Sequence, residues 1–171
     1  MKKIIAAALA ALLLATLAAG CGKKDSSGSP TGTPAEIIER IYKEKKPELM
    51  VGTQDIDVSD TDALKNHTGL SQNENVKEAA VSQAMIGSQA HSLVVLRVKD
   101  AATAAATAKE MLEGVDPAKW ICVQADEVEA AVKGDVILLV MVQSELGISA
   151  SDMVKAFEKV CGGAADETLK R

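Results

Sequence analysis

Aromatic and histidine residues are scarce in this chain of 171 residues, which holds one tryptophan, one tyrosine, one phenylalanine and two histidines. With Trp120, Tyr42 and Phe157 as its aromatic side chains, the chain has few platforms on which bases or sugars could stack. His67 and His91 form no His-Glu-x-x-His pattern, and the cysteines form no pair at zinc spacing. The sequence therefore predicts neither a structural zinc site nor a cofactor.

Clustered basic residues and phosphate-binding loops are also missing. No glycine-rich pattern of the kind that cradles phosphate groups occurs. Acidic residues outnumber basic ones by 24 to 19, and the net charge is −5. This balance argues against a nucleic-acid partner and against adhesion to anionic lipid headgroups.

The one long hydrophobic run lies at the N-terminus, although hydrophobic residues make up 47% of the chain. Met1-Lys2-Lys3 is a short basic start, and Ile4 to Ala19 is an apolar run broken by Thr16. The run is shorter than the roughly 20 residues that a membrane-spanning helix needs. A basic start, a short apolar core and small residues at its end predict a cleaved signal peptide over residues 1–20, with an uncleaved anchor helix as the alternative.

Leu17-Ala18-Ala19-Gly20-Cys21 closes this region and resembles the lipobox of bacterial lipoproteins. In that family the small residues suit the signal peptidase, and the thiol takes a diacylglyceryl group. The resemblance implies that Cys21 is the lipidated first residue of a protein held on the cell membrane and facing outside the cytoplasm. The alternative is a free or disulfide-bonded Cys21. Removal of residues 1–20 deletes Lys2 and Lys3 and no acid, so the mature charge is 17 − 24 = −7.

Residues 21–33 are rich in glycine, serine and threonine, which predicts a flexible tether behind the lipidated cysteine. We expect a single α+β domain over residues 34–163 and a polar tail over residues 164–171. The first helix begins at Thr33-Pro34-Ala35-Glu36, where threonine caps, proline takes the first helical position and glutamate completes a capping box.

An acidic stretch over residues 55–62 lies in an expected loop that leads into a short helix. Ser59 and Asp62 form a capping box for that helix. The oxygens of Asp55, Asp57 and Ser59 resemble the opening of an EF-hand calcium loop, but the turn glycine and the closing glutamate are missing. We predict an acidic helix cap, with weak calcium binding by these three residues as the alternative.

A strand-strand-helix pattern occurs twice in the remainder of the chain. We therefore expect a mainly antiparallel four-stranded sheet with helices on it. Two strands are apolar on both faces, as central strands covered on both sides are. We expect the N-terminal helix to cover the second face of the sheet, and a partner that covers this face is the alternative. The strands are predicted at 76–85, 91–99, 127–132 and 136–143, and the helices end before Gly114 and Gly162.

Catalytic patterns are weak. Ser88 and Ser92 lie near His91 in the sequence, but neither serine lies in a Gly-x-Ser-x-Gly turn, and we expect His91 to be exposed. Glu127 and Glu129 share a strand face that we expect to be solvated. Acid–base catalysis needs a buried, perturbed carboxyl group, which nothing here predicts, so we assign no catalytic residue.

Two cysteines, Cys122 and Cys161, remain once Cys21 is assigned. In an exported domain they are candidates for a disulfide that closes a loop of roughly forty residues and contributes about 3–4 kcal/mol. Two buried free thiols acting as small hydrophobic side chains are the alternative. Trp120 is expected to be an anchor in the core or at its rim, with a ligand platform as the alternative.

The lipidated cysteine, the tether, the AEIIERIY helix and the KGDVILLVMV strand resemble small Gram-positive lipoproteins that carry the domain of unknown function 4358. The resemblance covers roughly residues 35–160 and implies a secreted, anchored α+β domain of unassigned activity. We predict a non-catalytic module that binds an envelope protein or a small ligand. A cell-envelope hydrolase and a self-associating structural lipoprotein are the alternatives.

Overall fold

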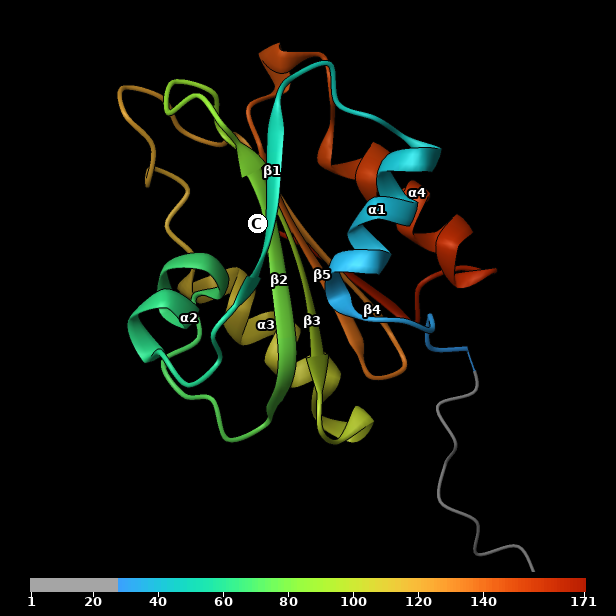
Figure 1. Cartoon of the computed structure of the whole chain (residues 1–171). Coiled ribbons are helices and arrows are strands. Elements are labelled where there is room, and N and C mark those ends of the chain that lie inside the picture. The colour runs from blue at the N-terminus through green and yellow to red at the C-terminus, as the bar shows by residue number, and fades with distance from the viewer. Residues whose placement is uncertain (1–27) are drawn as a thin grey trace, which may run out of the picture.

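Six strands and four α-helices form residues 28–171, the part of the chain that this computed structural model describes (Figure 1). Cys21 and the predicted signal peptide lie outside the described residues. No helix within residues 28–171 has the length and hydropathy to cross a membrane. In chain order the elements are α1 (Pro34–Glu44), β1 (Val51–Ile56), α2 (Thr61–Thr68), β2 (Val76–Ala84), β3 (His91–Val98), the 3-10 turn η1 (Ala101–Thr103), α3 (Ala104–Gly114), β4 (Glu127–Lys133), β5 (Val136–Val142), the 3-10 turn η2 (Ser144–Leu146), α4 (Ala150–Cys161) and β6 (Glu167–Lys170).

All six strands pair antiparallel in one sheet of order β1-β2-β3-β5-β4-β6. The α+β class is confirmed, but the prediction of four strands is wrong, because the four predicted strands are flanked by two edge strands. β1 lies where we expected a loop, and β6 lies where we expected a polar tail. Both edge strands are short and mostly exposed, so neither shows the apolar alternation by which a half-buried strand is recognised.

Helices cover both faces of the sheet (Figure 1). α1 and α4 pack together on one face, so the prediction that the N-terminal helix alone covers a second face is wrong: it shares its face with the last helix. α2 and α3 pack on the other face, and the two strand-strand-helix units therefore send their helices to opposite sides. The α1/α4 core includes Ile37, Ile41, Leu93, Leu138 and Phe157, and the α2/α3 core includes Leu64, Leu96, Met111, Ile137 and Leu139.

The helix starts follow the predicted caps, with one shift. At α1 the Thr33 N–H donates to the Glu36 carboxylate at 2.9 Å, and the Glu36 N–H donates to the Thr33 hydroxyl at 3.3 Å. At α2 the cap is Asp60, whose Oδ1 accepts two first-turn N–H groups at 3.0 Å each. The expected cap, Ser59, instead donates its hydroxyl to Asp57 at 2.6 Å. The carboxylate is the stronger acceptor, and it takes the capping role.

Arg97, near the end of β3, holds the segment before α1 against the sheet, and we call this set of bonds the Arg97 clamp. The guanidinium donates to Glu78 at 3.2 Å and to both Asp135 oxygens at 2.7 and 2.8 Å. Its remaining N–H groups donate to the backbone oxygens of Pro30 at 2.9 Å and Gly32 at 3.0 Å. This segment, expected within a flexible tether, is therefore fixed to the domain.

Candidate functional site

His91 lies inside the protein, and the prediction that it is exposed was wrong. Its side chain is 0% exposed, and Tyr42 of α1 covers it with a hydroxyl 3.0 Å from Nε2. Burial lowers the pKa of His91 to about 4 and raises the pKa of Tyr42 to about 12. Both side chains are therefore neutral at physiological pH.

The structure does not bring a serine and His91 together as a nucleophile and its base. Ser92 follows His91 in β3, so its side chain points to the opposite face of the sheet. Ser88 lies in the exposed β2–β3 turn. Ser82 of β2 shares the His91 face, and its hydroxyl and His91 Nδ1 have no hydrogen-bond partner among residues 28–171. These groups form a polar spot inside the α1/α4 core.

The carboxylates of β4 are structural rather than solvated. Glu127 accepts the Ala150 N–H at the start of α4 at 2.7 Å. Glu129 is 6% exposed and accepts from the Ser151 hydroxyl and from Lys170 Nζ, both at 2.8 Å. The expectation that this strand face is solvated was wrong, because α4 lies over it. The two glutamates fasten the start of α4 and strand β6 to β4.

The calcium candidates do not form a cage. Asp55 lies in β1, and Asp57 accepts both the N–H and the hydroxyl of Ser59 at 2.9 and 2.6 Å. Within residues 28–171, no three His, Cys, Asp or Glu side chains lie close enough to hold a metal ion.

Neither Cys122 nor Cys161 forms a disulfide in the structure, so the candidate bond is not found. Cys122 is exposed, in a loop, and adopts a positive φ of 61°. Cys161 is the last residue of α4 and packs against the α1/α4 core. Burial raises the pKa of Cys161 to about 11, against the opposing effect of Lys133 and Arg40. Trp120 packs half-buried against the α2/α3 core, as the rim interpretation predicts.

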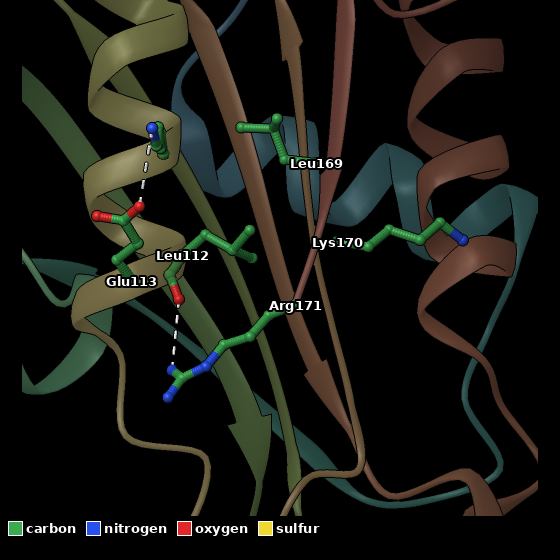
Figure 2. Close-up of a pocket in the computed structure, with 6 residues that line it drawn as sticks. Leu112, Glu113, Leu169, Lys170 and Arg171 are labelled. Carbon is green, nitrogen blue, oxygen red and sulfur yellow. Dashed lines mark hydrogen bonds and ion pairs between the residues drawn. The ribbon is translucent and has the colours of Figure 1, made fainter.

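A groove of about 430 Å³ lies between α3 and β6 (Figure 2). Arg171 points toward the end of α3 and donates to the carbonyls of Leu112 at 3.4 Å and Val115 at 2.9 Å. Lys170 extends to the other side of β6, and Lys109 lies 3.9 Å from Glu113. The charged groups of this groove are engaged within the fold, so the groove is the crevice left where a short edge strand meets a helix.

A second hollow of about 270 Å³ lies between α2 and the end of α3. Lys119 reaches into it, with Nζ 3.4 Å from the carbonyl oxygen of Asn66 and 5.2 Å from the centre of the Trp120 ring. Burial lowers the pKa of Lys119 to about 8, although Asp116 opposes the shift. Lys119 therefore fills part of the hollow and makes a cation–π contact with the Trp120 ring.

Four large apolar side chains are exposed at one end of the sheet, and we call this surface the apolar tip. They are Met50 (67% exposed), Met85 (66%), Ile86 (51%) and Ile121 (72%). The tip combines the residue before β1, the β2–β3 turn and the loop before β4, and this turn and this loop lie beside each other at the upper left of Figure 1.

Backbone hydrogen bonds hold these three segments together. The Met85 N–H donates to the Met50 carbonyl at 2.9 Å, and the Ile121 N–H donates to the Gly87 carbonyl at 3.1 Å. The Ile121 side chain lies over the turn, with its Cδ1 3.5 Å from where a Cβ of Gly87 would stand, an ordinary van der Waals distance. Apolar side chains of this size on turns and loops are candidates for an interaction surface.

The sequence carried a partial signal for the tip. Met85-Ile86 stands where a hairpin turn usually has polar residues, which marks it as unusual. Met50 and Ile121 join it through contacts distant in sequence, which a single segment does not reveal. No protein-family model, curated protein or solved structure matches the chain.

Proposed function

We propose that the mature protein begins at a lipidated Cys21, is anchored to the cell membrane outside the cytoplasm, and binds another protein through the apolar tip. The exposure of Met50, Met85, Ile86 and Ile121 on three hydrogen-bonded segments carries this proposal, since large apolar side chains gathered in water mark interaction sites. Methionine adapts its shape to a partner, which suits a protein-binding surface. The acidic charge and the scarcity of aromatic residues favour a protein over nucleic acid or sugar.

The position of the Arg97 clamp supports this arrangement. The clamp holds Pro30 and Gly32 beside Asp135, in the β4–β5 turn, at the end of the sheet opposite the β2–β3 turn. The sheet is about 30 Å long, from the nine residues of β2 at about 3.3 Å each. A tether of the kind that the composition predicts for residues 22–28 reaches about 15 Å on average. We therefore expect the tip to face away from the membrane that holds the lipid.

The lipobox-like segment and the resemblance to lipoproteins with the domain of unknown function 4358 are the sequence support for the anchor. We expect palmitate labelling of the wild-type protein and its recovery with membranes. Cys21→Ser is expected to abolish the labelling. Labelling that persists in Cys21→Ser would contradict lipidation at Cys21, and a wild-type protein that is recovered with membranes without labelling would favour an uncleaved helix.

Protein binding is tested by placing a photo-crosslinking amino acid at Met85 in the full chain in cells. We expect crosslinked adducts at Met85 and none when the same probe replaces Lys109, which is exposed on α3. Adding Ile121→Glu to the Met85 probe should remove the adducts. Equal adducts at both positions, or none at Met85, would refute the proposal. Turnover of peptidoglycan, ester or phosphate substrates by the purified protein would favour the hydrolase alternative.

A further inference from the structure

Strand β1 is a sheet edge whose outer side is free. Met50 accepts a hydrogen bond from Met85, the residue opposite it, and hydrogen-bonded pairs alternate along an antiparallel ladder. Gly52 and Gln54 therefore bond to β2, while Thr53 turns its N–H and C=O outward. Val51 and Asp55 do the same, and none of these outward groups has a partner among residues 28–171. Exposed unpaired backbone of this kind is a template for one more strand.

The two ends of this edge differ in chemistry. Its start adjoins the apolar tip, since Met50 directly precedes β1. Its end leads into exposed carboxylates, and within the described residues none of them forms an ion pair: Asp55, Asp57, Asp60 and Asp62. An added strand would meet apolar surface at one end and negative charge at the other.

We propose that the partner bound at the apolar tip contributes an extended segment of about six residues that pairs antiparallel with β1, an inference that rests on the proposed function. In this orientation the N-terminal half of the segment lies beside the carboxylates and carries lysine or arginine. Its C-terminal half lies on the tip and carries apolar residues. The outward groups of Val51, Thr53 and Asp55 supply the hydrogen bonds, and the two ends fix direction and register.

A second copy of the chain fits this edge poorly. Antiparallel pairing of β1 with another β1 lays the acidic end of each strand on the apolar tip of the other. Parallel pairing places like charges side by side. The opposite edge, β6, is a weaker template because it has four residues and carries Lys170, features that protect sheet edges.

Two matched variants separate the edges. Thr53→Pro removes an outward N–H of β1 and leaves the bonds of Gly52 and Gln54 to β2 intact. Thr168→Pro is the control on β6. Arg171 donates to the opposite Val128 at 3.0 Å, so Thr168, three residues before it, also turns its N–H outward. Unfolding midpoints of both variants confirm that each chain folds, and Asp55→Lys with Asp57→Lys gives a second test of the edge that introduces no proline.

The probe is a displayed library of random twelve-residue peptides, selected on the chain from residue 21 carrying Cys21→Ser. We expect enriched peptides with basic residues before apolar ones. The best of them should bind Thr53→Pro and the double-lysine variant at least tenfold more weakly, and Thr168→Pro within twofold. Bound peptide should slow hydrogen exchange of the Val51, Thr53 and Asp55 amides.

Other outcomes overturn the inference in distinguishable ways. Strand addition at β1 is refuted if the selected peptides bind Thr53→Pro and the double-lysine variant as tightly as the parent chain. It is also refuted if the selected peptides do not place basic residues before apolar ones. If Met85 adducts persist in that case, the proposed function stands alone; if they are absent, both fail. A concentration-dependent mass that Thr53→Pro abolishes would make a second copy the occupant instead.

Discussion

Replacement of Arg97 by methionine tests whether the clamp stabilises the domain. The Arg97 side chain is 10% exposed, and its partners Asp135 and Glu78 are 19% and 37% exposed. Methionine keeps much of the aliphatic stem but removes the guanidinium that donates to the Asp135 carboxylate and to two backbone carbonyls. Removing one partner of a buried pair costs about 3–5 kcal/mol. We expect about 3 kcal/mol, since Asp135 keeps some contact with water and Glu78 is too exposed to add much.

Urea unfolding of the Cys21→Ser chain measures this loss. With a denaturant dependence of about 2 kcal/mol per M, Arg97→Met should lower the midpoint by about 1.5 M. An unchanged midpoint would show that the clamp contributes nothing. A double-mutant cycle with Asp135→Asn should show coupling above about 1 kcal/mol, because the two side chains are in direct contact.

The pH dependence of the stability difference between the wild type and Arg97→Met tests whether the Arg97–Asp135 ion pair is its cause. Burial alone would raise the pKa of Asp135, but hydrogen bonds from Arg97 and Ser29 outweigh it and lower the pKa below its ordinary value of 3.8. The pair therefore stabilises the fold above about pH 3.8 and loses its effect as the pH falls through the lowered pKa. The difference between wild type and Arg97→Met should narrow at low pH. A gap of equal size at pH 7 and pH 3 would refute the ion pair as its cause.

Three further predictions follow, each read from unfolding curves. Phe157→Ala should cost about 3–5 kcal/mol, because Phe157 is fully buried in the α1/α4 core. Between pH 6.5 and about 4 the unfolded chain binds a proton at His91 that the folded chain does not. The free energy of unfolding of the wild type should therefore decrease as the pH is lowered through this range, and His91→Leu should make this decrease smaller. Gly114→Ala should destabilise by about 1–3 kcal/mol, because a Cβ there would lie 2.4 Å from the Gly69 carbonyl oxygen.

Each of these predictions has a result that would contradict it. A loss below 1 kcal/mol for Phe157→Ala would mean that α4 does not depend on this side chain. A profile of His91→Leu as steep as that of wild type would assign the pH dependence to other groups. Stabilisation by Gly114→Ala would contradict the close approach, since alanine is favoured over glycine in an unhindered helix.

Local chemistry decided which elements could be predicted from the sequence. The Thr33 cap and the apolar strands β3 and β5 depend on neighbouring residues, and all were predicted. β1 is recognised as a strand only when β2 lies beside it, because the four residues between Val51 and Ile56 are exposed on both faces. The burial of His91 depends on Tyr42, which lies 49 residues earlier in α1. The missed features are therefore those that arise from contacts between distant segments.

The free energy available at the apolar tip explains why it would act together with the β1 edge. A large apolar side chain gains about 1.5–3 kcal/mol on full burial. Since the tip side chains are 51–72% exposed, a partner that covers all four gains roughly 4–8 kcal/mol in total. Association itself costs about 4 kcal/mol or more, so the tip alone supports weak binding at best. Backbone pairing at Val51, Thr53 and Asp55 adds directional bonds, and the carboxylates add charge. A protein that binds specifically at this end of the sheet therefore requires the edge as well as the tip.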